Sequence, residues 1–411
     1  MAHIIAVVGA GGKTSLMERL AHEYSAGKYR VAITTTTQII AGKDSKLVTY
    51  YGKDIGNGKL GYPGSGSFQK ICLENQYVLV EADGARHHPV KIPNDSEPVI
   101  PEACERIIVV MSSFALGRAF SEICQRSFLA DMELFREAFG RFDKNTRLTK
   151  AHIDFIADTY YIKPLQKRFP KAKVEYYYNE PGRDVPVNPL KIKKIGMVLM
   201  ASGMSKRFGS NKLLYELNGK ELFRWGLDAL LETKARLKSS DKRLLNVPET
   251  DERRLLTESA LREIESEVIV VSRFPEILEH PEYRGRVVMT QNAAYAEGIS
   301  ASVRIGCVEA IRLGCDAVLY LVADEPYFTS GNLINMIREY LVFGKRLACA
   351  YSDHEANPAI FHLDAREELL KLKGDTGPIG IIRANPLDTY YYIVKNEKLF
   401  DIDVEEDLLS F

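Results

Sequence analysis

Hydrophobic runs of strand length alternate with segments of helical periodicity along almost the whole chain. Regular alternation of this kind predicts α/β layers and argues against a β-sandwich or a helix bundle. The expected strands form two sets, at residues 4–8, 31–34, 77–80 and 107–111, and at residues 195–200, 267–271, 287–289, 317–322 and 347–351.

A segment rich in proline and glycine separates the two sets. Residues 180–194, EPGRDVPVNPLKIKK, are typical of a linker. We therefore expect two domains, at residues 1–185 and 195–411. Many charges of both signs and little periodicity interrupt the second domain at about 234–263, which favours a solvated loop or an extended helix pair there.

Composition narrows the classes of function. Lysine plus arginine and aspartate plus glutamate number 55 each, so no overall field favours nucleic acid or an anionic membrane as a partner. The apolar runs are too short to span a bilayer, and no secretory signal precedes the first strand. The six cysteines are scattered without a CxxC pair, as expected of free thiols in a reducing compartment. We expect a cytoplasmic protein.

The first expected strand leads into a glycine turn and a helix, in IIAVVGAGGKTSLMERLAHEY. The glycines let backbone N–H groups approach phosphate oxygens, the lysine can reach β- and γ-phosphates, and the threonine hydroxyl can ligate Mg²⁺. The alternative is a tight strand–helix turn with an incidental lysine. The candidate nucleotide-binding residues are Gly9, Gly11, Gly12, Lys13 and Thr14.

Two later stretches support a nucleotide site. The run TTTT at 34–37 ends an expected strand, where hydroxyls can bind phosphate or metal-bound water. A further apolar strand ends in Glu81 and Asp83, at the position where a P-loop fold places its Mg²⁺-side carboxylate. Thr14, Glu81 and Asp83 are therefore the expected metal-side groups of this domain.

The motifs VGAGGKTS, ITTTTQI, VEADGARHHPVKIPNDSEPVIP and FALGRAF closely resemble the YqeC family over roughly residues 1–185. That resemblance implies a P-loop NTPase-like domain that binds ATP or GTP and serves the maturation of selenium-dependent molybdenum hydroxylases. A hydroxylase apoprotein is then a candidate partner. His87 and His88 either touch the ligand or are merely solvated.

A second glycine turn, LMASGMSKRFGSNKLL at 199–214, follows a strand but lacks a GK[ST] sequence. Its backbone amides, with Gly203 and Ser205, could hold a triphosphate, while Arg207 and Lys212 would neutralise departing pyrophosphate. Attack of one phosphate on another requires Mg²⁺. Asp324, at the end of an apolar strand, and Asp403, in an acidic C-terminal cluster, are the candidate metal-side groups.

The motifs LMASGMSKRFGSNKLL, QNAAYAEGISASVRIG, LVADEPYFT, ANPAIF, LKGDTGPIG and DIDVEEDL resemble the MocA/MobA-like molybdenum cofactor cytidylyltransferases over about 195–411. The resemblance implies a Rossmann-like nucleotidyltransferase domain with catalytic Arg207, Lys212 and Asp324. It also implies that nucleotide and pterin phosphate lie against Ala201, Ser202, Gly203, Ser205, Gly298, Ser300 and Asp375.

Departures from the family pattern concern the substrates. Serine stands at position 202, where alanine accompanies CTP and glycine accompanies GTP in related enzymes, and the family's usual His and Arg are absent from 356–358 and 378–379. The expected reaction is transfer of a cytidylyl group from CTP, or guanylyl from GTP, to the molybdopterin cofactor. The alternatives are another phosphorylated acceptor and a non-enzymatic cofactor carrier or insertion chaperone.

Overall fold

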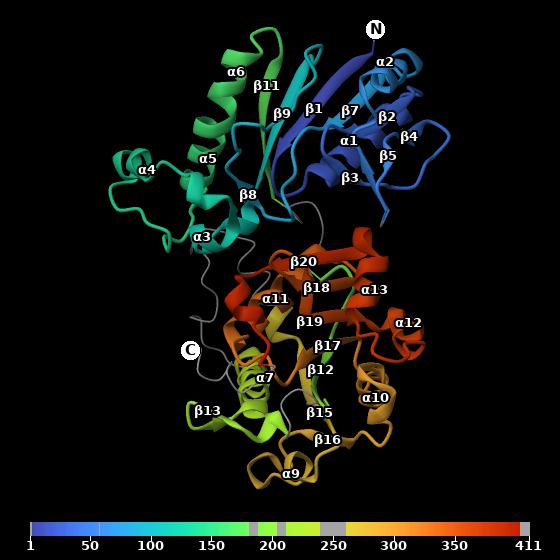
Figure 1. Cartoon of the computed structure of the whole chain (residues 1–411), viewed down its shortest axis with the longest axis vertical. Helices are drawn as coiled ribbons and strands as arrows, with labels where there is room; N and C mark the ends of the chain where they lie inside the picture. The colour runs from blue at the N-terminus through green and yellow to red at the C-terminus, as the bar shows by residue number, and fades with distance from the viewer. Residues whose placement is uncertain (1, 57, 181–187, 204–210, 239–259, 403–411) are drawn as a thin grey trace. The chain divides into compact units, whose positions relative to one another are not determined.

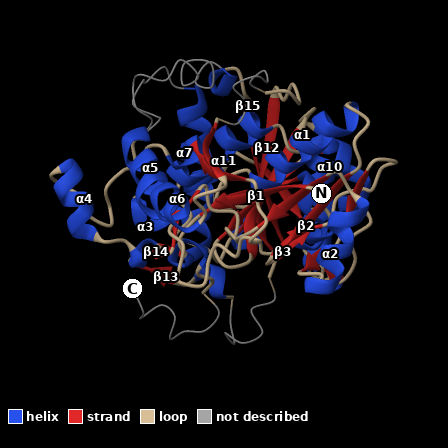
Figure 2. Ribbon diagram, turned by 90° about the horizontal axis from the view of Figure 1, so that it is seen from above, coloured by secondary structure: helices blue, strands red, loops and turns tan. Residues whose placement is uncertain are grey.

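The computed structural model describes residues 2–56, 58–180, 188–203, 211–238 and 260–402. The chain divides into two compact units, Met1–Pro181 and Gly182–Phe411. Each unit is an α/β structure in which helices flank the strands (Figure 2). Within the described residues, no helix is both long and apolar enough to cross a membrane.

The first unit is built on a six-stranded sheet in the order β11-β9-β1-β7-β2-β4, and all its pairings are parallel. Its strands are β1 His3–Gly9, β2 Val31–Thr35, β4 Val48–Tyr50, β7 Tyr77–Glu81, β9 Arg106–Ser112 and β11 Lys173–Asn179. Smaller strands are β3 Gln38–Ile40, β5 Lys53–Asp54, β6 Lys59–Gly61, β8 Val90–Lys91 and β10 Cys124–Gln125. The helices are α1 Lys13–Ala26, α2 Ser65–Glu74, α3 Phe120–Ile123, α4 Met132–Phe139, α5 Lys150–Ala157 and α6 Lys163–Arg168 (Figure 1).

The central strands of this sheet are continuous apolar runs in the sequence because they are buried on both faces. In β1 every residue after His3 is buried, because a central parallel strand is covered on both faces. Helix α1 packs Leu16, Met17 and Leu20 into a core shared with β1, β2, β7 and β9. Since all six strands run the same way, their carboxyl ends meet at one edge of the sheet.

The second unit contains a seven-stranded mixed sheet in the order β16-β15-β12-β17-β19-β18-β20. The first four strands are parallel, whereas β19 is antiparallel to both of its neighbours. The strands are β12 Lys194–Ala201, β15 Glu265–Ser272, β16 Val288–Gln291, β17 Ala317–Val322, β18 Leu347–Tyr351, β19 Glu355–His362 and β20 Thr389–Ile393, with a small hairpin of β13 Glu216–Leu217 and β14 Lys220–Glu221. The helices are α7 Leu222–Lys238, α9 Pro275–Leu278, α10 Ile299–Arg312, α11 Ser330–Phe343, α12 Arg366–Leu370 and α13 Ile379–Ala384 (Figure 1).

Four strands of the two large sheets were not predicted from the sequence: the short β4, and β11, β19 and β20. Strand β11 lies at a sheet edge and is only half-buried, so its sequence KVEYYYN lacks an apolar run. Strand β19 contains a proline, and the terminal strand β20 is mostly tyrosine. Of the expected insertion at 234–263, residues 234–238 continue α7, Leu261 is buried in the core, and 239–259 lie outside the described residues.

Candidate functional site

The glycine turn of the first unit follows β1 at the carboxyl edge of the sheet. Gly9 has a φ of 90°, and a Cβ there would lie 2.2 Å from the Val110 carbonyl oxygen. At Gly11, a Cβ would lie 2.4 Å from the Cβ of Ser112. The backbone of the turn therefore lies directly against β9, and neither position can accept a side chain. The third glycine, Gly12, immediately precedes α1.

Lys13 is the first residue of α1, and its side chain turns back over the glycine turn. It is 5% exposed, and its Nζ donates to the Gly9 carbonyl at 2.8 Å. The same ammonium lies 3.2 Å from Asp83 Oδ1 and 3.5 Å from Glu81 Oε1. Burial alone would lower the pKa of Lys13, but attraction to Asp83 and Glu81 outweighs it, and the pKa is raised. The structure thus brings together the lysine and both acids predicted from the sequence.

Asp83 connects the turn to the interior. Its Oδ2 accepts hydrogen bonds from the Gly9 N–H and the Tyr161 hydroxyl, each at 3.0 Å. The buried Lys91 ammonium lies 3.5 Å from the same oxygen and 2.6 Å from Glu97. Neither Tyr161 nor Lys91 was singled out from the sequence. For Lys91, the local sequence offered only its position in the PVKIP segment, and for Tyr161 it offered no pattern.

The other predicted groups of this unit are Thr14 and the threonine run at 34–37, and none of them contacts Lys13 in a hydrogen bond or ion pair that the structure records. Thr14 is half-buried in the first turn of α1. In the threonine run, Thr35 donates to the Glu81 carbonyl at 2.9 Å and Thr36 to the Val99 carbonyl at 2.7 Å. Thr34 is fully buried, and its hydroxyl has no hydrogen-bond partner within the described residues. Two of these hydroxyls thus bond the protein's own backbone.

The two histidines lie in the loop after β7. His87 is exposed, and the Nδ1 atom of His88 lies 3.0 Å from the Arg86 carbonyl oxygen. Across the described segments, no group of three or more His, Cys, Asp or Glu residues is arranged to hold a metal ion. The assignment of Thr14, Glu81 and Asp83 to Mg²⁺ stays a prediction.

In the second unit, two serine hydroxyls join the carboxyl ends of β12 and β15. Ser202 Oγ donates to the Val271 carbonyl at 3.1 Å, and Ser272 Oγ donates to the Ala201 carbonyl at 2.8 Å. Ser202 is buried, whereas Gly203 is exposed. The predicted Ser205 and Arg207 lie outside the described residues. The hydroxyl of Ser202 is therefore used to pair the two strands.

Lys212 follows β12 in the sequence and contacts Asp324, which follows the neighbouring strand β17. It is 6% exposed, and its Nζ lies 2.7 Å from Asp324 Oδ2. It also donates to the Ile402 carbonyl at 2.6 Å and lies 3.4 Å from Asp401 Oδ1. The structure therefore joins the two predicted residues Lys212 and Asp324. Asp403 lies outside the described residues.

Glu325 is an acid beside this cluster to which the sequence assigned no role. It is 8% exposed, and its Oε2 lacks a hydrogen-bond partner among the described residues. Burial, then Asp324 and Asp401, raise the pKa of Glu325 well above its ordinary value. The carboxyl groups of Asp324 and Asp401 thus contact the ammonium of Lys212, and Glu325 lies near those two acids.

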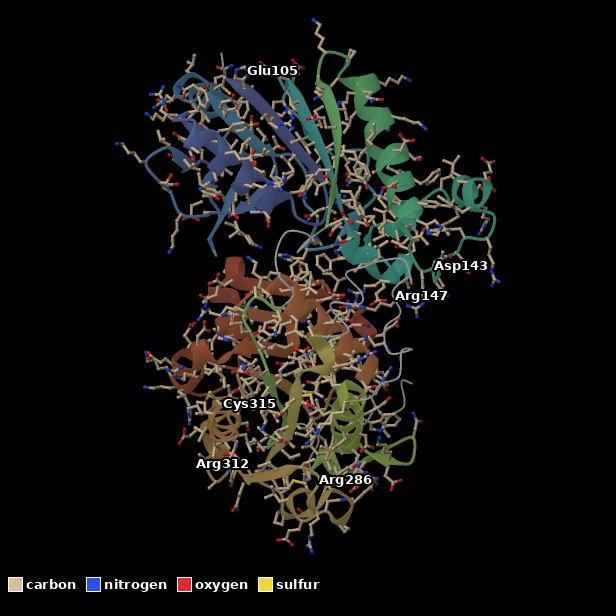
Figure 3. All side chains as sticks on the ribbon, turned by 180° about the vertical axis from the view of Figure 1, so that it is seen from behind. Glu105, Asp143, Arg147, Arg286, Arg312 and Cys315 are labelled. Carbon is tan, nitrogen blue, oxygen red and sulfur yellow. The ribbon has the colours of Figure 1, made fainter. Side chains whose placement is uncertain are left out.

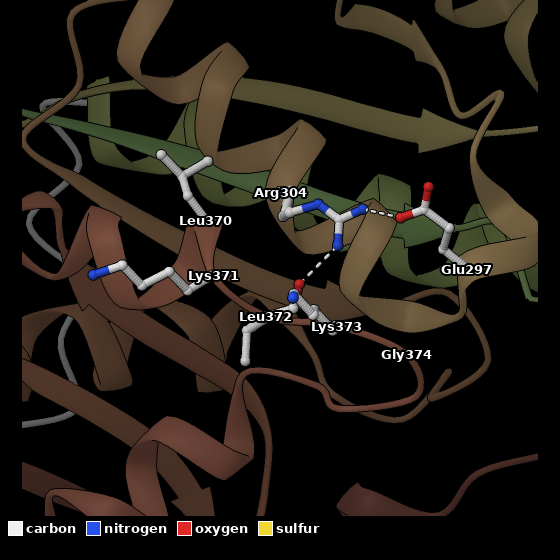
Figure 4. A pocket seen from close by; sticks show the side chains of 7 residues that line it. All are labelled: Glu297, Arg304, Leu370, Lys371, Leu372, Lys373 and Gly374. Atoms are coloured by element: carbon white, nitrogen blue, oxygen red, sulfur yellow. Dashed lines mark hydrogen bonds and ion pairs between the residues drawn. The ribbon is translucent and has the colours of Figure 1, made fainter.

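The other predicted nucleotide-side residues meet at the start of α10. A Cβ on Gly298 would lie 2.3 Å from Asp375 Oδ1, and the Ser300 N–H donates to the Gly374 carbonyl at 3.2 Å. Arg304 holds this junction, since it donates to Ser300 Oγ at 3.2 Å. Arg304 also bonds the Leu372 carbonyl in a pocket lined by Glu297, Arg304, Leu370, Lys371, Leu372, Lys373 and Gly374 (Figure 4).

Both units place a buried lysine beside an aspartate at the carboxyl edge of parallel strands, and in the first unit a glycine turn lies there as well, which is typical of α/β nucleotide-binding proteins. Residues 5–127 match the YqeC protein family, and residues 197–389 match the MobA-like NTP transferase domain. The chain carries an N-terminal YqeC domain fused to a C-terminal MobA-like NTP transferase domain. The resemblances of the sequence to the YqeC family and to MobA-like transferases are confirmed.

Curated relatives match each half separately. An uncharacterized protein YqeC of Escherichia coli (strain K12) is 32% identical over 140 residues, which cover 29% of this chain and 55% of that protein. A phosphoenolpyruvate guanylyltransferase of Sphaerobacter thermophilus is 33% identical over 134 residues, covering 30% of this chain and 63% of that protein. Each match therefore spans less than two thirds of the relative.

Solved structures similar to this chain include Rv0371c of Mycobacterium tuberculosis, with a TM-score of 0.37, 16% identity, and coverage of 53% of this chain and 100% of that one. A molybdopterin-guanine dinucleotide biosynthesis protein A of Archaeoglobus fulgidus has a TM-score of 0.35, 16% identity, and coverage of 52% and 95%.

Proposed function

We propose that the C-terminal domain transfers a nucleoside monophosphate from CTP or GTP to the molybdopterin cofactor and releases pyrophosphate. The observation that carries this proposal is the ion pair of Lys212 with Asp324, at 2.7 Å on the carboxyl edge of the sheet. The MobA-like domain supplies the reaction class. Its fusion to a YqeC domain supports an acceptor from molybdenum-enzyme maturation.

The transfer requires a cation where the leaving group departs. An oxygen of the acceptor phosphate forms a bond to the α-phosphorus, while the bond from that phosphorus to the β-phosphate oxygen breaks. The electron pair leaves with pyrophosphate, on which negative charge accumulates. Lys212 is held by Asp324, Asp401 and the Ile402 carbonyl, so its charge is positioned before substrate arrives. A preorganised ammonium stabilises the transition state more than a mobile one.

Two aspartates beside Lys212 are candidate ligands for a hard divalent cation, although the described residues form no group of three or more His, Cys, Asp or Glu that would hold one. Asp324 and Asp401 both contact the ammonium, and the nearby Glu325 has a buried oxygen with no partner among the described residues. Carboxylate oxygens are the protein ligands that Mg²⁺ prefers. Mg²⁺ held by Asp324, with Asp403 as a further candidate ligand, would offset the repulsion between the two reacting phosphates.

For the YqeC domain we propose ATP or GTP binding at the glycine turn, with slow hydrolysis that depends on Lys13. Support comes from the position of Lys13 at the start of α1, where the helix dipole and the lysine charge both favour phosphate. Asp83 and Glu81 already contact this ammonium, so phosphates would compete with the acids for it.

A panel of four nucleoside triphosphates tests both assignments. The full chain is supplied with Mg²⁺ and the pterin cofactor, and pyrophosphate and orthophosphate are measured separately. We expect pyrophosphate release with CTP or GTP, lost in Asp324→Ala and retained in Lys13→Ala. Orthophosphate release should show the opposite dependence. Absence of pyrophosphate with every triphosphate refutes the transferase proposal.

A second acceptor class has specific support. The relative that is 33% identical is named a phosphoenolpyruvate guanylyltransferase, so a small phosphorylated acid is a reasonable alternative acceptor. Screening phosphorylated acids and sugars for pyrophosphate release separates the two. If pyrophosphate is released with such a compound and not with the pterin, the compound is the acceptor and the molybdenum cofactor is not.

A further inference from the structure

Asp83 presents its two carboxylate oxygens to different partners. Its Oδ2 accepts hydrogen bonds from the Gly9 N–H and the Tyr161 hydroxyl, each at 3.0 Å. The same oxygen lies 3.5 Å from the Lys91 ammonium. Its Oδ1 lies 3.2 Å from the Lys13 ammonium and has no hydrogen-bond partner within the described residues. Two lysines therefore share one buried carboxylate, each at a different oxygen.

Lys91 is fixed in the interior by the segment that carries it. It is fully buried at the end of β8, which pairs with β10. Its ammonium donates to the Gly84 carbonyl at 2.5 Å and to Glu97 Oε2 at 2.6 Å, so that with Asp83 it has one acceptor for each of its three protons. Burial lowers the pKa of Lys91, while the two carboxylates beside it favour the ammonium form. The side chain is out of reach of any ligand.

Capture of Lys13 by a polyphosphate would take one of the two cations away from Asp83. A buried carboxylate without a counterion is strongly destabilised, because no other charge offsets the loss of its hydration. With Lys91 in place, Oδ2 keeps a cation and two hydrogen bonds, so Asp83 stays compensated when Lys13 moves to the phosphates. Lys91 therefore makes the release of Lys13 less costly.

We propose that Lys91 is a positioning residue of the N-terminal nucleotide site, which compensates the charge of Asp83 and so allows Lys13 to exchange this acid for a bound polyphosphate. Lys91 does not touch the nucleotide and acts only through Asp83. This inference rests on the nucleotide binding proposed for the YqeC domain. It implies that nucleotide affinity depends on a lysine that the ligand cannot contact.

The test is calorimetric titration of the full chain with ATP and with GTP in the presence of Mg²⁺. All proteins carry Lys212→Ala, which removes the buried lysine of the C-terminal site. Lys91→Met keeps a long unbranched side chain but no charge, and it should bind nucleotide about 10-fold or more weakly. Because Lys13 has left Asp83 both in the complex and in the transition state, KM for orthophosphate release should rise while kcat changes by less than about twofold.

Glu97→Gln distinguishes positioning from a general structural role. It breaks the same ion pair, 2.6 Å long, but leaves Lys91 to Asp83, so nucleotide should bind at least as tightly as to the unsubstituted chain. Glu105→Gln is the surface control, since Glu105 is exposed beside His3 just before β9 and its substitution should leave the affinity unchanged (Figure 3). If Glu97→Gln weakens binding as much as Lys91→Met does, the ion pair acts only on the structure and the inference is overturned.

Failure of the inference differs from failure of the proposed function. If nucleotide binding is lost in Lys13→Ala but Lys91→Met keeps the unsubstituted affinity, the inference alone is overturned. If no nucleotide binding depends on Lys13, the proposed function of this domain is refuted, and the inference with it. Thermal unfolding verifies that each variant is folded. Should Lys91→Met not fold, the double variant Lys91→Met with Glu97→Gln, in which neither member of the pair is buried alone with its charge, takes its place with the same expected loss.

Discussion

Replacing Tyr161 by phenylalanine removes one hydroxyl from the interior of the YqeC domain and leaves the ring in place. Tyr161 is fully buried, and its hydroxyl donates to Asp83 Oδ2 at 3.0 Å. The same oxygen accepts from the Gly9 N–H at 3.0 Å and lies 3.5 Å from the Lys91 ammonium. The substitution therefore weakens the support of the acid that contacts the glycine turn.

The size of the effect follows from the partners that remain. A hydrogen bond to a charged group contributes about 1.5–3 kcal/mol to stability. Because Asp83 Oδ2 keeps two other partners, we expect a loss near the lower limit, about 2 kcal/mol. For a domain of this size, about 2 kcal/mol lowers the melting temperature by about 4–8 °C.

Differential scanning calorimetry of the full chain measures this change and can separate the unfolding of the two domains. Tyr29→Phe is the matched control, since Tyr29 is 45% exposed, and its loss of a hydroxyl should change stability by less than about 0.5 kcal/mol. A Tyr161→Phe variant as stable as Tyr29→Phe would refute the reasoning, because the Tyr161 hydroxyl would then contribute nothing through Asp83.

Three further predictions concern other parts of the molecule. Gly9→Ala should prevent folding of the YqeC domain, seen as lost calorimetric unfolding, because its Cβ would meet the Val110 carbonyl at 2.2 Å. Burial lowers the pKa of His152, so its contribution to stability is complete above its ordinary pKa of 6.5 and is lost as the pH falls through the lowered value. His152→Gln keeps an acceptor for the Thr149 N–H but cannot take up a proton. The melting temperature of this variant should therefore fall less than that of the wild type between about pH 7.5 and about pH 5. An equal fall in both proteins would contradict the role of His152. Ser202→Ala should cost about 1 kcal/mol in unfolding, because its hydroxyl bonds the Val271 carbonyl, but it should leave the preferred triphosphate unchanged. A switch of the preferred base in the panel of four triphosphates would assign the hydroxyl to the base instead.

The sequence predicted the parts of each site that depend on local pattern. A buried strand followed by glycines, a lysine and a helical stripe gave the first turn, and apolar runs ending in Glu81 and Asp324 gave the acids. These predictions work because parallel strands bring their carboxyl ends to one edge wherever they lie in the chain. Once two such strands are neighbours, Lys13 meets Asp83, and Lys212 meets Asp324.

Contacts between distant segments were not predictable in the same way. Tyr161 is separated from Asp83 by 78 residues, and nothing in a helical segment marks which tyrosine faces the sheet. The pairing of Lys212 with the Ile402 carbonyl spans 190 residues and involves a backbone atom, on which the sequence is silent.

Among the described residues, the two domains share one arrangement of a lysine and an acid. In each, a lysine that follows one strand in the sequence is almost fully buried and contacts an aspartate that follows the neighbouring parallel strand. The acid keeps the ammonium charged and in place, which a buried lysine alone could not do. A bound polyphosphate would replace the acid as the partner of the lysine, and the freed carboxylate could then take up a divalent cation. Binding of phosphate and of cation would thus be coupled at each site, because each ligand supplies the charge that the other leaves unpaired.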